Sequence, residues 1–246
     1  MQKINQDKVK LLLSVMNEQE VSYVKDYADI IDLKNPNDGP LGSLDINQIK
    51  KIIKRFGDKY IFSATLGNKM GMCEIVKKIR SYENLGLNYI KVGYFSNSKP
   101  RLYNFLALLN KNRVKTKIVL VLFAENRGIL QEIKENMSIL VKNGIQNLLV
   151  DTNNKYSLSL TEIYTYEFLR GLVQKAQDND LKIGLAGKIK FNQLNNLLNL
   201  SPHIIGMRGA ICKNDSRDNH VQKEKVVNVY QLFNSYKSNA HAVAGA

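Results

Sequence analysis

Short runs of β-branched and other apolar residues alternate along the chain with longer stretches in which apolar residues recur every three or four positions. The short runs predict eight strands, at residues 9–15, 28–34, 60–67, 89–95, 117–123, 147–152, 181–187 and 203–210. The longer stretches predict amphipathic helices, among them residues 46–56, 73–86, 129–144, 160–180, 191–200 and 223–237. Strands that alternate with helices pair in parallel through right-handed crossovers, so the pattern predicts a parallel α/β sheet.

Two parallel architectures fit this alternation, a closed barrel and a doubly wound open sheet. An open sheet of that kind ordinarily has a glycine-rich turn after its first strand, whereas the turn after residue 15 reads MNEQEV. The length of 246 residues suits one eight-stranded barrel. We therefore predict an α/β fold with a single (β/α)8 TIM barrel as the catalytic domain over residues 1–237. Residues 238–246 lose the helical period and are expected to form a loose C-terminal tail.

Ionisable side chains stand at the carboxyl ends of several predicted strands, where barrels of this kind place their reacting groups. Asp32 and Lys34 share one face of the second strand, because side chains alternate along a strand. Burying both costs several kcal/mol each unless they are paired or used in chemistry. Lys91 ends the fourth strand, and Asp151 ends the sixth, with Lys155 in the loop that follows. The pattern predicts that these five residues face one site.

Ordinary structural explanations compete with this interpretation. Asp151 precedes Thr152, and both residue types commonly cap helices. Lys155 lies among Asn and Ser residues and would suit an exposed loop equally well. Lys91 is harder to explain structurally, because a lone lysine in a strand usually occupies a sheet edge and a closed barrel has none.

The candidate chemistry combines a nucleophilic amine with a phosphate site. The pKa of a lysine falls readily on burial, which lets Lys34 attack a carbonyl and form an imine. Glycines at the seventh and eighth strand ends allow backbone amides to approach an anion, and Gly187, Lys188, Arg208 and Gly209 are the candidate phosphate-binding residues. The residues alone thus favour an imine-forming lyase or aldolase that acts on small phosphorylated carbonyl compounds without a cofactor.

The composition restricts which partners and metal sites are expected. The net charge of +14 favours an anionic partner, but the basic residues are spread along the chain, so most are expected on solvated helix faces. Cys73 and Cys212 are too few for a disulfide framework, and the scattered His203, His220 and His241 predict no metal site. The first residues resemble neither a secretory signal nor a membrane span, so we expect a cytoplasmic protein with no membrane contact.

Six blocks of the sequence carry a resemblance to a known family. They are, in chain order, ADIIDLKNPNDGPLG, SATLG, YIKVG, LVDT with a lysine four residues after its aspartate, LAGKIK and RGAICK. With these blocks, the chain resembles the (5-formylfuran-3-yl)methyl phosphate synthases of methanofuran biosynthesis, also called 4-(hydroxymethyl)-2-furancarboxaldehyde-phosphate synthases. The blocks run from the second predicted strand to the eighth, and the first is highly specific.

The resemblance implies a reaction and a role for each candidate residue. Two glyceraldehyde 3-phosphate molecules would condense, with loss of one phosphate and of water, to a phosphorylated furan aldehyde. Lys34 would form the imine, and Asp32 would manage protons beside it. Lys91 would be the proton acceptor, while Asp151 and Lys155 would assist the dehydrations and the loss of phosphate. Groups placed in this way typically contribute about 10²- to 10⁴-fold each to the rate.

The chain also departs from the family pattern. FAENRG follows the fifth strand where the family leads us to expect an aspartate, so Glu125 or Asn126 would replace that contact or the contact would be lost. KNDSRD, which contains Arg217, alters a glycine-rich turn, so the resemblance assigns Arg217 no firm role in phosphate binding.

Two alternative functions stay open at this point. One is a generic class I aldolase that acts on another phosphosugar. The other is a non-catalytic basic barrel that binds nucleic acid, although no basic stretch is interleaved with stacking aromatic residues. We expect a small phosphorylated substrate and no nucleic-acid partner, and the sequence leaves a homo-oligomer open.

Overall fold

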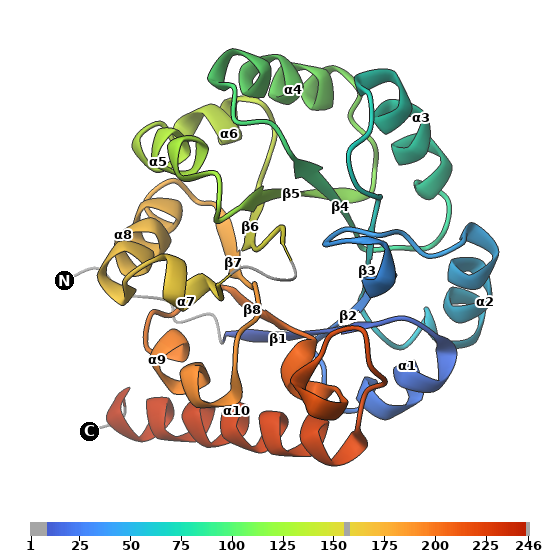
Figure 1. The fold of residues 1–246 in the computed structure, drawn as a ribbon, viewed down its shortest axis with the longest axis vertical. Coiled ribbons are helices and arrows are strands. Elements are labelled where there is room, and N and C mark those ends of the chain that lie inside the picture. Colours follow the sequence, from blue (N-terminus) through green and yellow to red (C-terminus); the bar gives the residue numbers. More distant parts are fainter. Residues whose placement is uncertain (1–8, 155–157, 245–246) are drawn as a thin grey trace.

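Eight parallel strands form a closed barrel in the computed structural model, which describes residues 9–154 and 158–244 (Figure 1). Each strand pairs with the next along the chain, and β8 pairs with β1. The prediction of a (β/α)8 barrel is confirmed. The strands are β1 Lys10–Val15, β2 Ile30–Leu33, β3 Phe62–Thr65, β4 Tyr89–Tyr94, β5 Lys117–Phe123, β6 Asn147–Asp151, β7 Lys182–Leu185 and β8 Ile204–Met207.

Helices surround the barrel on all sides (Figure 1). The α-helices are α1 Glu18–Val24, α2 Ile46–Phe56, α3 Met72–Tyr82, α4 Lys99–Lys111, α5 Arg127–Glu135, α6 Ser138–Lys142, α7 Leu160–Ile163, α8 Tyr166–Gln177, α9 Leu194–Leu198 and α10 Lys223–Ala244. Short 3-10 turns are η1 Pro36–Asp38, η2 Phe191–Gln193, η3 Gly209–Ile211 and η4 Lys213–Asp215. Helix α10 packs along one side of the barrel beside α9 and α1.

Three helical predictions differ in detail from the structure. The stretch 160–180 forms two helices, because Thr165 is extended and its side chain accepts a hydrogen bond from Phe168 N, which caps α8. The stretch 129–144 likewise divides into α5 and α6. Helix α10 continues to Ala244, past residue 238, where the loose tail is expected to begin. No Gly or Pro occurs in α10 before that end, and Ala favours a helix.

The main hydrophobic core lies between the outer face of the barrel and the helices. Outward-facing strand residues such as Leu13 and Leu120 belong to one buried cluster with helix residues such as Ile49 and Leu106. A smaller cluster fills the barrel interior and is formed by Leu41, Val119, Val121, Phe123, Leu149 and Ala186. The two clusters reflect the alternation of side chains along each strand.

Strand register brings polar side chains together inside the barrel. Asp32 on β2 is the register partner of Ser14 on β1 and of Ser63 on β3. One step further toward the carboxyl ends, Thr65 on β3 is paired with Lys91 on β4. These side chains are all buried. The polar layer therefore lies at the end of the barrel where active sites of this fold are built.

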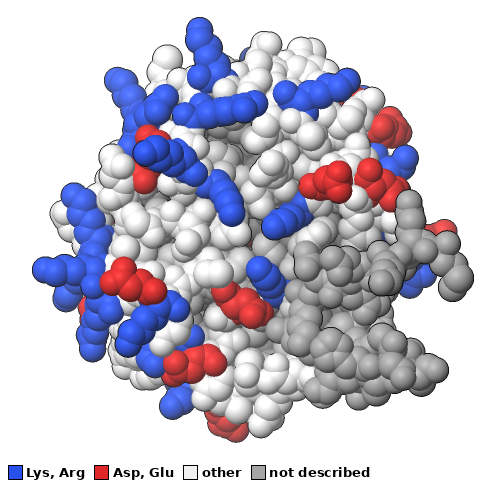
Figure 2. All heavy atoms as spheres, turned by 180° about the vertical axis from the view of Figure 1, so that it is seen from behind, with Lys and Arg blue, Asp and Glu red and all other residues white. Residues whose placement is uncertain are grey.

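Charged side chains are scattered over the outer surface. Figure 2 shows Lys and Arg side chains scattered over the face turned away from Figure 1, with Asp and Glu among them. None of the helices within the described residues combines the length and the apolar character that crossing a membrane requires.

Candidate active site

A cavity of about 680 Å³ opens at the carboxyl ends of the strands. The predicted site residues that fall within the described part of the chain all line it: Asp32, Lys34, Lys91, Asp151, Gly187, Lys188, Arg208 and Gly209. Lys155, the remaining candidate, lies outside the described residues. Residues far apart in the sequence are thus brought together by the barrel.

Asp32 is the centre of a buried polar network. Its carboxylate accepts hydrogen bonds from Ser14 Oγ at 2.8 Å and from Ser63 Oγ at 2.6 Å. Lys91 Nζ lies 2.9 Å from Asp32 Oδ2, and both side chains are at most 5% exposed. Burial alone would raise the pKa of Asp32, but the charges of Lys91 and Lys34 outweigh it and hold the pKa below its ordinary value. Asp32 therefore stays ionised.

Lys34 occupies a different environment from Lys91. Its Nζ donates a hydrogen bond to the backbone carbonyl of Pro40 at 2.7 Å, and the residue is 7% exposed. Burial lowers the pKa of the Lys34 ammonium to about 8. Asp151 and Asp32 oppose that shift, whereas the positive charges of Lys91 and Arg217 add to it. Asp32 shares a strand face with Lys34, but its ion pair is with Lys91 on β4.

The loop after β2 holds the Pro40 carbonyl over Lys34. Asn35 N donates to Gly42 O at 2.8 Å, which closes the loop, and Thr65 Oγ1 donates to the same carbonyl at 2.7 Å. A Cβ at position 42 would lie 2.3 Å from Asn35 O, so only glycine allows this approach. The turn NPNDGPLG therefore shapes the surroundings of the buried amine.

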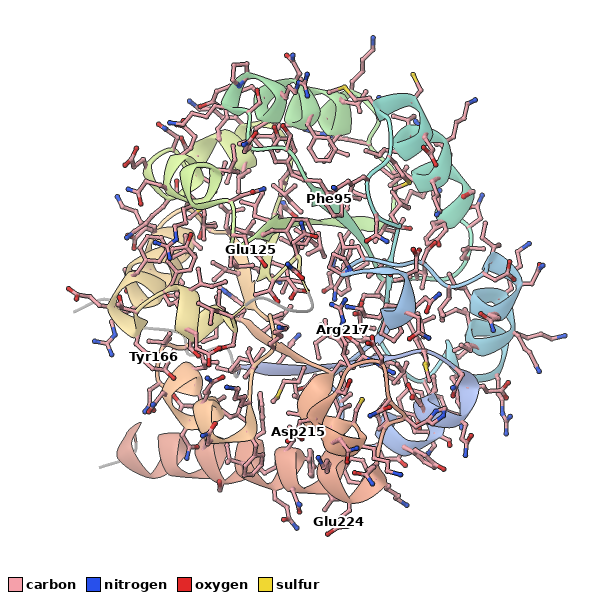
Figure 3. The ribbon with its side chains drawn as sticks, viewed as in Figure 1. Phe95, Glu125, Tyr166, Asp215, Arg217 and Glu224 are labelled. Carbon is pink, nitrogen blue, oxygen red and sulfur yellow. The ribbon has the colours of Figure 1, made fainter. Side chains whose placement is uncertain are left out.

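Asp151 enters the cavity from the end of β6. Its Oδ1 accepts a hydrogen bond from Thr152 N at 2.7 Å, and the side chain is half-buried. The following backbone is held by Glu125, whose carboxylate accepts hydrogen bonds from Asn153 N at 2.9 Å and Asn154 N at 3.1 Å. Glu125, in the stretch where the chain departs from the expected family pattern, thus contacts the backbone that follows Asp151. Figure 3 shows Glu125 at the rim of the central opening.

The β7 end provides glycine and lysine at the cavity wall. Gly187 has φ +102°, and a Cβ there would lie 2.8 Å from Thr152 Cγ2, so the chain needs glycine here. Lys188 follows with φ 51° and lines the cavity. Burial, together with the charge of Arg217, holds the pKa of Lys188 below its ordinary value.

Arg208, a candidate phosphate ligand, has its hydrogen-bond donors engaged within the protein. Nε donates to Arg217 O at 2.6 Å. Nη1 donates to Ser14 O and to Glu20 Oε2, both at 2.9 Å. Nη2 donates to Glu20 Oε1 at 3.4 Å and to Asn219 O at 3.2 Å. These bonds use all five N–H groups of a guanidinium, so Arg208 faces the cavity as a structural residue.

Glu20, the partner of Arg208, is missing from the candidates predicted from the sequence. It lies on α1, is 2% exposed, and also accepts hydrogen bonds from Met16 N at 2.9 Å and Val221 N at 3.1 Å. In the sequence, Glu20 lies in the stretch MNEQEV after the first strand, together with Glu18. Nothing in that stretch indicates which of the two glutamates is buried. Only the fold shows that one of them is buried.

Within the described residues, no group of three or more His, Cys, Asp or Glu side chains is placed so that it could hold a metal ion. Cys212 is buried and Cys73 is exposed, and both are free thiols. Burial raises the pKa of Cys212 to about 11.

Comparison with known families identifies the chain. A family model described as 4-HFC-P synthase matches residues 11–230, from β1 into α10. The chain belongs to the 4-HFC-P synthase family. The resemblance seen in the sequence blocks is thereby confirmed. The cavity at the carboxyl ends of the strands, which residues of these blocks line, is the candidate active site of an enzyme of this family.

Curated relatives support the same assignment over about nine-tenths of the chain. The (5-formylfuran-3-yl)methyl phosphate synthase of Archaeoglobus fulgidus is 29% identical over 236 residues, covering 91% of this chain and 98% of its own. The enzyme of the same name from Methanosarcina barkeri is 29% identical over 228 residues, covering 89% and 96%. Among solved structures, 3-hexulose-6-phosphate synthase from Salmonella typhimurium superposes with a TM-score of 0.64 at 16% identity, covering 93% of this chain and 100% of its own. That likeness shows the barrel fold.

Proposed function

We propose that this protein condenses two molecules of glyceraldehyde 3-phosphate into (5-formylfuran-3-yl)methyl phosphate, with release of phosphate and water. The family and the names of the curated relatives support the product. The observation that carries the mechanism is the buried Lys34 amine, whose pKa is lowered to about 8 at the floor of a cavity with other cations.

Lys34 is the proposed imine-forming residue. Its neutral amine attacks the carbonyl carbon of one substrate, the carbonyl oxygen leaves as water, and nitrogen becomes joined to carbon. The protonated imine then withdraws electrons from the neighbouring carbon, which can lose a proton and attack the second aldehyde. The imine nitrogen takes the role that a metal ion would otherwise have at the carbonyl, so the proposed route is metal-independent.

Lys91 and Asp32 are proposed to handle the proton at that carbon. The Lys91 ammonium first gives a proton to the carbonyl oxygen that leaves as water, and the resulting neutral Lys91 amine then accepts the proton from carbon. Asp32 holds the Lys91 side chain at 2.9 Å, while Ser14 and Ser63 fix the carboxylate in place. The ionised state of Asp32 favours this supporting role. Its contribution to proton transfer therefore passes through Lys91.

Loss of phosphate and water is assigned to the β6 end. Asp151 lines the cavity with its carboxylate half-buried, and Lys155 follows it by four residues in the sequence. A carboxylate there can remove protons during the dehydrations, and a lysine there can neutralise the leaving phosphate. Gly187, Lys188 and Gly209 are proposed to bind a substrate phosphate from the β7 and β8 ends.

Replacing Lys34 tests the mechanism directly. Lys34→Arg keeps the positive charge but removes the amine, since a guanidinium does not lose its proton at neutral pH. We expect loss of both furan absorbance and phosphate release with glyceraldehyde 3-phosphate. The exposed Lys50→Arg serves as control and should retain both.

Borohydride trapping supplies the second measurement. Reduction in the presence of glyceraldehyde 3-phosphate should add the mass of one bound triose phosphate to the wild-type protein and none to Lys34→Arg. Turnover retained by Lys34→Arg, or equal trapping in both proteins, would count against an imine at this position. Phosphate release without a furan would instead indicate an aldolase or an eliminase.

A further inference from the structure

Arg217 is brought to the cavity by the loop between β8 and α10. A bridge between Cys212 and Val221 closes the base of this loop, and Lys213 N donates to His220 O at 3.0 Å. Arg217 lies at the tip of the segment and lines the cavity. Figure 3 shows it beside the central opening, whereas Glu224, at the start of α10, lies at the outside of the molecule.

The Arg217 guanidinium is poorly satisfied by the described protein groups. Its Nε is buried without a hydrogen-bond partner in that part of the chain, and the side chain is 18% exposed. The neighbouring Asp218 carboxylate forms an ion pair with Nε at 3.7 Å, which is too long for a hydrogen bond. Leaving a buried charged donor without a hydrogen bond is costly, so this geometry favours a ligand that accepts hydrogen bonds and carries negative charge.

Neighbouring lysines show that cations converge on this part of the cavity. The charge of Arg217 acts on Lys34 at the cavity floor and on Lys188 at the β7 end, and in both cases it disfavours the ammonium form. Like charges held close in a partly buried site repel one another. A bound dianion would remove that repulsion.

Arg208 and Glu20 fix the loop that carries Arg217. Arg208 Nε donates to the backbone carbonyl of Arg217 itself, at 2.6 Å, and Nη2 donates to Asn219 O. Glu20 pairs with the Arg208 guanidinium and also accepts a hydrogen bond from Val221 N. The buried ion pair therefore binds the loop backbone at three residues: Arg217, Asn219 and Val221. Both side chains are at most 4% exposed.

We propose that Arg217, together with Lys188, binds a phosphate group of the substrate, and that the buried Glu20–Arg208 pair is the positioning element that presents Arg217 to it. The inference deepens the proposed function and rests on it for the identity of the substrate. It assigns phosphate as the ligand of the altered turn KNDSRD, which contains Arg217. It also assigns a positioning role to Arg208, whose own hydrogen-bond donors are already engaged.

Binding of inorganic phosphate, measured by isothermal titration, tests the ligand assignment. Arg217→Gln should raise the phosphate Kd about tenfold to a hundredfold, as expected for loss of a charged hydrogen-bonded contact. Arg217→Lys should restore part of the affinity. Arg170→Gln, which removes the same charge from the exposed face of α8, should bind as the wild type does. Equal binding by Arg217→Gln, or no phosphate binding by the wild type, would overturn the assignment.

Substrate kinetics separate this inference from the proposed function. In Arg217→Gln the KM for glyceraldehyde 3-phosphate should rise about tenfold or more. Borohydride trapping of glyceraldehyde, which has no phosphate, should be unchanged when it is measured at pH 9.5, where the Lys34 amine is largely neutral. A wild-type protein that forms no furan but binds phosphate through Arg217 would refute the proposed function and leave this inference standing.

A double-variant cycle tests the positioning role. Arg208→Lys keeps the charge but cannot reproduce the forked contacts, so it should weaken phosphate binding when Arg217 is present and add little in Arg217→Gln. A further loss in the Arg217→Gln background would mean that Arg208 contacts phosphate itself, and would overturn the positioning role. Glu20→Gln, which keeps the size of the side chain, provides the same comparison if Arg208→Lys fails to fold.

Discussion

Two lysines at the same end of one barrel are prepared for different tasks by their nearest neighbours. Lys91 is held against an ionised carboxylate, whereas Lys34 donates to a neutral carbonyl. A carboxylate stabilises the charged form of an amine, and burial next to a neutral group favours the uncharged form. The side chain suited to attack a carbonyl is therefore Lys34, although both residues are lysines at strand ends.

The pH dependence of catalysis is the first consequence of this difference. With a pKa of about 8, the neutral fraction of Lys34 rises from about one-tenth at pH 7 to about nine-tenths at pH 9. The neutral amine is the nucleophile, so kcat/KM should climb about tenfold per pH unit below pH 8 and level off above it. Initial rates of furan formation between pH 6 and 9.5 measure the profile. A rise that continues to pH 9.5 without levelling off would indicate a lysine with an ordinary pKa.

Removing the Asp32 carboxylate should destabilise the protein as well as inactivate it. In Asp32→Asn the buried Lys91 ammonium loses its counterion, and breaking one side of a buried pair typically costs about 3–5 kcal/mol. Urea unfolding measures this loss in the free energy of unfolding. Asp26→Asn, which breaks the exposed pair with Lys25, should change stability by less than about 1 kcal/mol. Equal effects in the two variants would contradict a buried pair.

At the scale of elements, the pattern of apolar residues predicted the barrel, but it did not predict which polar side chains pair with one another inside it. All eight predicted strands occur, because parallel strands buried on both faces leave a strong apolar signal. Partner choice depends on strand register and on loop shape, which a single sequence does not display. For that reason Asp32 is paired with Lys91 rather than Lys34, and Arg208 is engaged by Glu20 from a distant helix. The break between α7 and α8 depends on one cap at Thr165.

The loop after β6 shows how a neighbouring element can control catalytic residues. Glu125 accepts the amides of Asn153 and Asn154, between Asp151 and Lys155. Glu125→Gln keeps the size of the side chain but weakens these charge-assisted bonds. We expect kcat for furan formation to fall about tenfold to a hundredfold, since small displacements of catalytic groups have effects of that order. Borohydride trapping at Lys34 should be unaffected.

A matched variant separates this effect from a general loss of charge. Glu167→Gln removes the same carboxylate from the exposed face of α8 and should leave kcat unchanged. If Glu125→Gln abolished trapping as well as turnover, the loop would be required for imine formation, and the assignment of the β6 end to later steps would be wrong.

At the scale of the whole molecule, the closed barrel gathers a surplus of cations around one opening. Lys34, Lys91, Lys188, Arg208 and Arg217 all line the cavity, and the net charge of the chain is +14. Basic residues are also scattered over the face of the molecule shown in Figure 2. A field of this sign attracts a phosphorylated substrate from a distance and raises its rate of encounter.

Ionic strength should therefore affect the capture of substrate more than the chemistry. Raising NaCl from about 20 mM to about 500 mM shortens the Debye length from roughly 20 Å to roughly 4 Å, which screens the exposed charges but leaves the buried ones largely unaffected. We expect kcat/KM for glyceraldehyde 3-phosphate to fall severalfold, while kcat and the trapping of uncharged glyceraldehyde change little. Steady-state kinetics at the two salt concentrations measure both. An equal fall in kcat would place the salt effect inside the cavity, and a constant kcat/KM would show that the +14 charge has no part in substrate capture.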